Sequence, residues 1–290
     1  MTSGSLNVIS CMFWRYGSCF SGNGGAIYVV GDQLSVNECT FYQCSACSGK
    51  LGGALYADCT VGITMKKTCS YKCSAGYGHF YYVEGISSSI LDFELISIVF
   101  NGLSTSGNDG IHHNRGLQAI KSTNSSKNHG SDVSCFVHYY PASLLSVFST
   151  FQNNTSSGSR LGLLDSGTSS LVLSKNNFIN NVVSSSSIGI FEIRGSTYKL
   201  EDCIIHGNNY RLFYVSSGSL QVNSCFILHN GVSNYGSVSL SNVQSTYATP
   251  YQNEHYVNMY CPGEKAMIET KIMQNRPFGY IVFFINAMVI

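Results

Sequence analysis

The segment from Asn108 to Arg115 brings more reactive side chains together than other stretches of the 290-residue chain. It holds one acid (Asp109), two imidazoles (His112 and His113) and the guanidinium of Arg115. A carboxylate beside a histidine can orient the ring for acid–base catalysis, and the same groups can bind a metal or a polar ligand. The alternative is a polar loop in which Asn-Asp-Gly makes a tight turn. We therefore treat these four residues as candidates for ligand binding, and predict no catalytic residue, no metal site and no cofactor.

The elements that must position this segment are indicated by two motifs that recur in a fixed order. The first motif is an aromatic or aliphatic residue followed three places later by Asn, Cys or another polar residue. It begins at Phe13, Phe41, Tyr71, Phe100, Phe151, Phe178, Ile205 and Ile227. The second motif, glycine with small or apolar residues, follows the first and is clearest in Gly24-Gly25-Ala26-Ile27 and Gly52-Gly53-Ala54-Leu55. The long gap from Phe100 to Phe151 predicts a degenerate turn between them.

A repeat of this length predicts a solenoid, because one short unit cannot bury its own apolar face and must stack on its neighbours. Alternating runs such as Leu171-Val172-Leu173 favour strands, and no segment shows a convincing helical stripe. We predict an all-β fold, a right-handed parallel β-helix of eight to nine turns over residues 1–250. Residues 251–290 would then form a C-terminal cap or a truncated membrane-proximal segment.

The residue types of the two motifs suit the corners of such a fold. Glycine permits a positive φ or a close approach of neighbouring turns. Asparagine tolerates the left-handed region and can hydrogen-bond along a stack of its own kind. In the early turns cysteine replaces asparagine, as in Phe41-Tyr42-Gln43-Cys44. We therefore expect stacked columns of asparagine and cysteine along the molecule.

The 12 cysteines are many for a cytosolic protein and suggest a secreted or surface-exposed chain. A column two places before the aromatic residue contains Cys11, Cys39, Cys69, Cys203 and Cys225. Two interpretations stay open, a stack of buried thiols or some disulfides. The disulfides would form among Cys39, Cys44, Cys47, Cys59, Cys69 and Cys73. Cys44 and Cys47 form a CxxC pair without a second pair at zinc-finger spacing, so we do not expect zinc.

Charge and glycosylation signals bear on the partners. Charged residues make up 11% of the chain, its formal net charge is +1, and it lacks the concentrated Lys and Arg that phosphate binding needs. We therefore do not expect nucleic acid as a partner. Glycosylation sequons begin at Asn124, Asn153 and Asn154 and agree with a glycoprotein.

The two ends of the chain favour a fragment of a surface protein. It opens with Met1-Thr2-Ser3 and enters the repeat without the pattern of a signal peptide. The last 13 residues, Phe278 to Ile290, are mostly apolar but fewer than the about 20 that a spanning helix needs. This run is either a truncated membrane anchor or a last strand or helix that caps the solenoid. We expect membrane contact, if any, through this run.

The motifs also carry a family resemblance. The glycine motif paired with the aromatic–asparagine motif resembles the repeats of chlamydial polymorphic outer-membrane proteins. The mixed form, Cys39 to Ser45 followed by Gly52-Gly53-Ala54-Leu55-Tyr56, is similar to the β-helix surface proteins of trichomonad parasites. The resemblance covers most of residues 6–250. It implies an extracellular β-helix, often anchored by a C-terminal membrane helix, with a role in adhesion. The stacked exterior would offer rows of Ser, Asn, Thr and Tyr, which suit repetitive ligands such as glycans or host or other cell-surface proteins.

A carbohydrate-active enzyme is the alternative, because pectate lyases and polygalacturonases also use parallel β-helices. Sugar hydrolysis needs two carboxylates at one cleft, and a lyase would need an acid cluster for Ca²⁺. The 15 acidic residues are scattered without an Asp-Asp pair. His206-Gly207 with Arg211 loosely resembles polygalacturonase elements, but His206 is better explained by the repeat. We expect a non-enzymatic module, with Asp109 and His112 as the first residues to test for catalysis.

Overall fold

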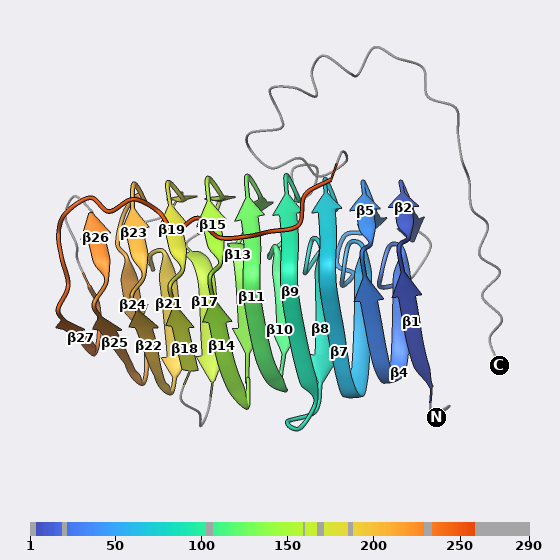
Figure 1. The fold of residues 1–290 in the computed structure, drawn as a ribbon, viewed down its shortest axis with the longest axis horizontal. Coiled ribbons are helices and arrows are strands. Elements are labelled where there is room, and N and C mark those ends of the chain that lie inside the picture. The colour runs from blue at the N-terminus through green and yellow to red at the C-terminus, as the bar shows by residue number, and fades with distance from the viewer. Residues whose placement is uncertain are drawn as a thin grey trace, which may run out of the picture.

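The computed structural model describes residues 4–18, 22–102, 107–158, 160–166, 171–184, 188–228 and 234–258. This part of the chain contains strands and no helix. The strands pair in parallel with their equivalents one turn away and stack into a β-solenoid of about seven turns (Figure 1). The prediction of an all-β parallel solenoid is therefore confirmed.

Each turn contributes strands to three lateral faces. The first face contains the first halves of β4 (Ile27–Asn37) and β7 (Leu55–Tyr71), then β8 (Tyr81–Gly85), β10 (Ile111–Asn114), β13 (Val133–Tyr139), β17 (Arg160–Ser166), β21 (Phe191–Gly195) and β24 (Phe213–Val215). The second face contains β1 (Ser5–Ile9), β9 (Ile90–Val99), β11 (Leu117–Ser126), β14 (Ser143–Val147), β18 (Leu171–Ser174), β22 (Thr197–Glu201), β25 (Ser219–Asn223) and β27 (Val238–Ser241), with the middle parts of β4 and β7.

The third face is shorter. It contains β2 (Met12–Trp14), β5 (Thr40–Tyr42), β15 (Thr150–Gln152), β19 (Asn177–Ile179), β23 (Ile204–His206) and β26 (Phe226–Leu228), with the last residues of β7, β9 and β11. Short strands follow it at β3 (Gly17–Ser18), β6 (Ser45–Ala46), β12 (His129–Gly130), β16 (Thr155–Ser156) and β20 (Val182–Val183). Long strands such as β7 bend from one face into the next, so the three faces form one wall.

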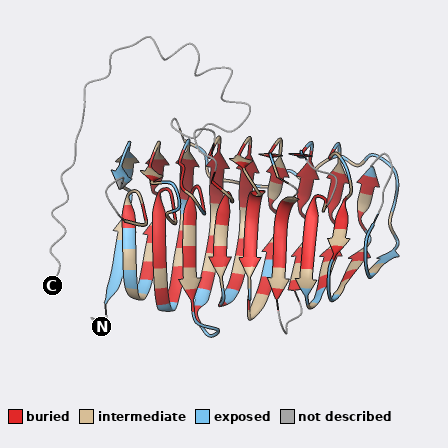
Figure 2. Ribbon diagram, turned by 180° about the vertical axis from the view of Figure 1, so that it is seen from behind, coloured by how far each residue is buried: buried red, intermediate tan, exposed pale blue. Residues whose placement is uncertain are grey.

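The interior is one continuous hydrophobic core along the stack. Strand alternation places every second side chain inward, and buried residues follow the strands through the length of the molecule (Figure 2). Aromatic rings stack from turn to turn inside, with 4.8 Å between the centroids of Phe13 and Phe41 and 5.2 Å between those of Phe151 and Phe178. Each turn therefore shields its neighbours from water, as a solenoid requires.

The first residues of the aromatic–asparagine motif line up in the interior in most turns but not in two. Phe41 pairs with Ser70, whereas Tyr71 lies one place further along and pairs with Tyr42 on the outer surface. Phe80 from the first face reaches Phe41 in the interior, with 5.6 Å between ring centroids, which accounts for the small side chain at Ser70.

In the next turn the inward position is taken by Ile98 and not by Phe100, where the motif begins. Phe100 itself occupies a corner with φ 57°. The gap that predicted a degenerate turn is filled by β10, β11 and β12, and Ser125 stands there in place of an aromatic residue.

The doubled glycines serve both of the purposes expected of them. Gly24 and Gly52 each have φ 69°, in the left-handed region that other residues rarely adopt. A Cβ atom on Gly25 would collide with the carbonyl oxygen of Gly53 in the next turn. The first glycine of each pair turns the chain, and the second allows neighbouring turns to approach.

A ladder of buried asparagines follows the third face and confirms the predicted column. The ladder consists of Asn101, Asn128, Asn154, Asn181 and Asn208. In each turn the backbone N–H donates to the side-chain Oδ1 one turn further on, at 2.8–3.0 Å. Cys73 donates its N–H to Asn101 at 2.6 Å and so continues the column, as does Cys44 one turn earlier. Asn230, which the motif also predicts, lies outside the described residues.

Residues 242–258, the described residues after β27, do not add another full turn. Residues 245–258, here called the strap, run back across the third face toward β7 (Figure 1). The N–H of Tyr251 donates to Oδ1 of Asn177 at 3.0 Å, and Asn177 donates to the carbonyl of Tyr251 at 2.9 Å. Further along, Asn258 donates to Oγ1 of Thr40 at 2.7 Å. The apolar run from Phe278 to Ile290 lies outside the described residues.

Candidate functional site

The four candidate residues do not all lie on the same side of the solenoid wall. On β10 the side chains alternate, so His113 points into the core and His112 points outward. Asp109 precedes the strand, and its Oδ2 lies 2.7 Å from Nδ1 of His112. Arg115 is exposed at the corner after β10, with φ 62°. The structure therefore brings together Asp109 and His112 and separates the other two.

The Asp109–His112 pair is fixed in place from several sides. The His112 ring stacks on Tyr82 of the preceding turn, with 4.2 Å between centroids and 13° between planes. The backbone carbonyl of Asp109 accepts a hydrogen bond from the N–H of His79 at 2.8 Å. A carboxylate at Nδ1 holds a histidine ring in one orientation, which suits either proton transfer or hydrogen bonding to a ligand.

This pair ends a row of stacked rings on the outside of the first face. The row, here called the first-face strip, consists of Tyr28, Tyr56, Tyr82 and His112. Successive ring centroids lie 5.3, 5.9 and 4.2 Å apart. Tyr56 is buried between its neighbours, Tyr82 and His112 are half-buried, and Tyr28 is exposed at the end of the row.

Carboxylates and an amide run beside the strip in the neighbouring outward row. Glu84 accepts a hydrogen bond from the hydroxyl of Tyr56 at 3.2 Å and from the amide of Asn114 at 2.7 Å. Burial and the charge of Glu84 raise the pKa of Tyr82 to about 12. The pKa of Tyr56 is raised by the same two causes, so both hydroxyls remain protonated at neutral pH and can donate hydrogen bonds.

Behind this surface the core contains a polar group that sequence reasoning did not find. The rings of His113 and His138 stack in parallel with 5.0 Å between centroids. Tyr81 and His113 share a hydrogen bond of 3.0 Å, and Nδ1 of His138 lies 2.6 Å from Oε1 of Gln118. Burial lowers the pKa of His138 to about 3 and lowers that of His113 well below its usual value. The alternation through Ile111 could have indicated that His113 points inward.

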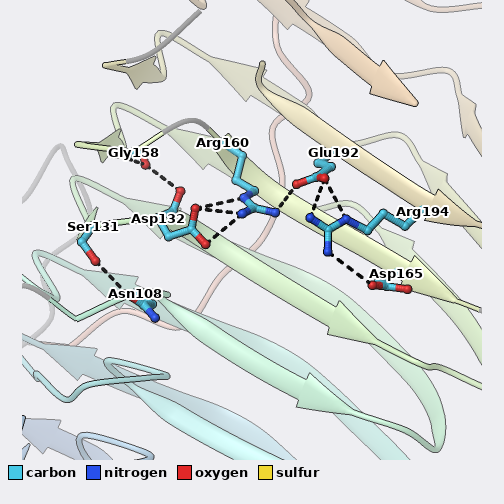
Figure 3. A network of polar contacts seen from close by, with 9 residues as sticks. Asn108, Ser131, Asp132, Gly158, Arg160, Asp165, Glu192 and Arg194 are labelled. Atoms are coloured by element: carbon cyan, nitrogen blue, oxygen red, sulfur yellow. Dashed lines mark hydrogen bonds and ion pairs between the residues drawn. The ribbon is translucent and has the colours of Figure 1, made fainter. Parts of the chain in front are cut away.

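A chain of ion pairs occupies the outside of the first face further along the stack (Figure 3). Arg160 binds Asp132 at 3.0 Å and also pairs with Glu192. Arg194 binds Glu192 at 2.7 Å and approaches Asp165 at 3.8 Å. Glu192 is buried, so these charges neutralise one another across three turns. The spacing of about one turn between Asp132, Arg160 and Glu192 is the sequence signal that could have identified the group.

Most of the cysteines that the structure describes carry free thiols. They include Cys11, Cys39, Cys44, Cys59, Cys73, Cys135, Cys203 and Cys225. Burial raises the pKa of Cys39 and of Cys59 to about 11, so these thiols are inert at neutral pH. Of the six cysteines considered for disulfides, Cys69 is disulfide-bonded. Cys69 is also displaced from the predicted column, where Thr68 stands, and pairs with Thr40.

The described residues contain no group of three or more His, Cys, Asp or Glu side chains arranged to hold a metal ion. Two of the three sequon asparagines, Asn124 and Asn154, are buried. The amide of Asn154 donates to the carbonyl of Ser125 at 2.9 Å, so the folded chain has no room for a glycan there. Asn153 is half-buried at a corner.

Comparison with known proteins identifies no relative, so the function is inferred from the fold and the surface of this chain. The sequence matches no family model, no curated protein and no solved structure at a significant level. The described residues contain no helix that is long and apolar enough to cross a bilayer.

Proposed function

We propose that the protein is a non-catalytic β-helix module that binds an extended ligand along its lateral faces and serves adhesion at a cell surface or in secreted form. The observation that carries this proposal is the first-face strip. Its rings repeat once per turn, as do the carboxylates and amide beside them. Groups that repeat in a row match a ligand that also repeats, whereas catalysis requires groups that converge on one reacting atom.

Glycans and cell-surface proteins are the ligand classes that fit. Tyrosine hydroxyls, Glu84 and Asn114 provide donors and acceptors at intervals of about 4.8 Å, the separation of neighbouring strands. Sugar hydroxyls or an extended peptide can hydrogen-bond to such a row. Nucleic acid does not suit this strip because its carboxylates would repel phosphate.

The cellular setting and the finer architecture belong to the same proposal. Resemblance of the repeat motifs to chlamydial and trichomonad surface proteins supports an extracellular location, with membrane contact through Phe278 to Ile290. Right-handed coiling is the usual preference for parallel strands joined by a crossover. The full chain would make eight to nine such turns.

A binding experiment with paired substitutions tests this function. Asp58→Asn with Glu84→Gln keeps the shape of the first-face strip and removes two carboxylates beside it, since Asp58 and Glu84 are paired positions of β7 and β8. Asp92→Asn with Glu94→Gln makes the same change on the second face and serves as the control. On a glycan array and on cultured epithelial cells, the first variant should lose on the order of tenfold in affinity and the control should match the unmodified protein. Folded protein that binds neither the array nor the cells would contradict the proposal.

The contact between Asp109 and His112 favours one second candidate, a pectate-lyase-like or polygalacturonase-like enzyme. In that case the carboxylate would orient the ring as a general base or acid. Incubation with polygalacturonate should then give product, and both Asp109→Asn and His112→Gln should reduce the rate by 10²-fold or more. Absence of turnover with folded protein rejects this candidate.

A further inference from the structure

The strap passes over one outward column of the third face, and Cys69 belongs to that column. Thr40, Cys69 and Ser97 are aligned partners in three successive turns. On one side of Cys69, Ser97 donates its hydroxyl to the carbonyl of Tyr256. On the other side, Asn258 donates its amide to Oγ1 of Thr40 at 2.7 Å. The strap therefore crosses the column at Cys69.

The side chain of Cys69 faces the strap and not the core. Aligned residues of neighbouring parallel strands point to the same side of the sheet, so Cys69 shares the outward direction of Thr40 and Ser97. The next residue, Ser70, aligns with Phe41 of the core and points inward. Cys69 is nevertheless 0% exposed. An outward side chain that is buried to this extent needs a covering segment, and the strap crosses at this place.

Cys69 is disulfide-bonded, and its partner is not among the free thiols named above. Of the 12 cysteines in the chain, this leaves Cys19, Cys47 and Cys261. A disulfide requires the two Cα atoms to lie about 4.4–6.8 Å apart. Since two turns are separated by about 9.6 Å, the partner must come from within one turn of Cys69 or from the strap side of the wall.

Two of these candidates lie too far along the wall. Cys19 follows β3, which lies beyond the corner after the third face and two turns before Cys69. Cys47 follows β6, which lies beyond the same corner one turn before Cys69. Ser45 of β6 bridges to Ser74, which is separated from Cys69 by that corner. Neither Cys19 nor Cys47 can therefore reach the outward column under the strap.

Cys261 is the remaining candidate, and the path of the strap brings the chain close to Cys69. It lies outside the described residues, three positions after Asn258. Asn258 contacts Thr40, whose strand is about 4.8 Å from that of Cys69. Three residues span up to about 10 Å, which is enough for the chain to return by one strand. Distance therefore permits Cys261 where it excludes the other two candidates.

We propose that Cys261 is the disulfide partner of Cys69 and that this bond, here called the strap latch, fixes the end of the strap covalently to β7. The two sulfur atoms form one bond as the thiols lose two protons and two electrons, which convert one molecule of oxidised glutathione, or of a similar disulfide oxidant, into two thiols. The strap latch keeps the end of the strap in place when its hydrogen bonds open, because a covalent bond does not open with them.

The strap latch is independent of ligand binding at the first-face strip. A lasting disulfide needs an oxidising compartment, which agrees with the proposed extracellular location. Negative results on the glycan array and the cells would leave the strap latch in place, and absence of the strap latch would leave binding at the first-face strip in place.

Peptide mapping without reduction tests the strap latch. The full chain is equilibrated with a mixture of oxidised and reduced glutathione, and its remaining thiols are alkylated under denaturing conditions. Digestion with trypsin and a glutamate-specific protease places Cys69 in residues 68–72 and Cys261 in residues 255–264, each without a second cysteine. Mass spectrometry should find these two peptides linked, and a reductant should separate them.

Other results of the same digest would overturn the inference. Residues 68–72 could be linked to residues 16–38, which contain Cys19, or to residues 39–50, which contain Cys47. Either linkage would assign Cys69 to a different partner. Recovery of residues 68–72 with an alkylated thiol after equilibration would show that no such bond forms.

The variant Cys261→Ser provides a second measurement. Cys69 should then be recovered with an alkylated thiol, and the amides of residues 256–258 should exchange with solvent on the order of tenfold faster, whereas β7 and β9 keep their protection. Cys11→Ser is the control, since it removes a free thiol from the first turn, and it should leave the linked peptides and the exchange rates unchanged. Equal exchange at residues 256–258 in Cys261→Ser and the unmodified protein would contradict the role of the strap latch in holding the strap.

Discussion

At the scale of single residues, the asparagine ladder explains how the corner after the third face is stabilised. Each buried asparagine accepts a backbone N–H from the preceding turn. Its amide donates to a carbonyl, or in Asn101 to the hydroxyl of Ser70, so both side-chain atoms have partners. Buried polar groups are costly unless they are satisfied in this way. Asn154 shows the arrangement fully, because it also donates to Oδ1 of Asn181 at 3.0 Å.

Asn154→Ala should therefore destabilise the fold by about 2–3 kcal/mol, since it leaves the N–H of Asn128 and the carbonyl of Ser125 unpaired. The free energy of unfolding in urea measures this effect. Asn153→Gly is the matched control at the adjacent position, where glycine tolerates the φ of 54°. We expect the control to cost much less, and equal losses would show that the ladder adds nothing specific.

The buried histidine pair makes stability depend on pH. Because burial holds the pKa of His138 at about 3, below the value near 6.5 of an unfolded histidine, the unfolded chain binds protons first as the pH falls. Stability is therefore complete above about pH 6.5 and decreases between that pH and about 3. His113, whose pKa is also lowered by burial, contributes with the same sign.

His138→Gln should make this acid dependence shallower by about 1.4 kcal/mol per pH unit, the contribution of one histidine. Urea unfolding at several values between pH 7 and pH 4 gives the slope for each protein. An unchanged slope would mean that carboxylates, rather than the core histidines, account for the loss of stability in acid.

At the scale of elements, the ion-pair chain in Figure 3 connects β17 to β21 on the first face. Glu192 is the central member because it is buried between two arginines. Removal of one partner from a buried ion pair leaves an uncompensated charge, which costs more than the loss of a surface pair.

Glu192→Gln should accordingly lower the free energy of unfolding by about 2–4 kcal/mol. Asp92→Asn, which breaks half-exposed pairs with Lys66 and Lys121, should cost about 1 kcal/mol or less. Chemical denaturation of both variants makes the comparison. If Glu192→Gln lowered the free energy of unfolding as little as Asp92→Asn, the two arginines would have to be solvated by water once Glu192 is removed.

The strap is a second element whose role can be isolated. Its two backbone hydrogen bonds to Asn177 and the bond from the Tyr251 hydroxyl to the carbonyl of Asp202, at 2.7 Å, hold it on the third face. Local segments with few buried contacts open more readily than a core. Release of the strap should therefore leave the solenoid folded.

Tyr251→Ala should increase the hydrogen-exchange rate of the amide at position 251 on the order of tenfold, while amides of β19 and β23 keep their protection. Tyr247→Ala is the control, since Tyr247 is 63% exposed. Uniformly faster exchange throughout the solenoid would show that the strap is part of the cooperative unit.

At the scale of the whole molecule, the sequence predicted the parts of the fold that arise from local repetition. Gly24, Gly52 and the asparagine of each later turn have strict backbone or hydrogen-bonding requirements, so their residue types could be read directly. The exchange of asparagine for cysteine within one column was also foreseen at Cys44, where the motif keeps its position although the residue type changes.

Features that depend on contacts between distant residues could not be predicted. Tyr71 lies on the outer surface because Phe80, from a different face, fills the interior beside Ser70. The strap joins positions such as Asn258 and Thr40 that share no local pattern. The division of the four-residue candidate site is a different case, because the local alternation along β10 could have indicated that His113 faces inward and His112 outward.

The central claim is that successive turns stack in the register described above, and spin-label distances test it most directly. Outward positions of the second face lie in one column through Ser35, Ala119, Val172 and Gln221. Labels on Ser35 paired with each of the other three span three, five and seven strand steps. Double electron–electron resonance should give distances of about 14, 24 and 34 Å, within the uncertainty of the label linkers. Distances that do not increase linearly with the number of turns would contradict the solenoid and the binding surfaces built on it.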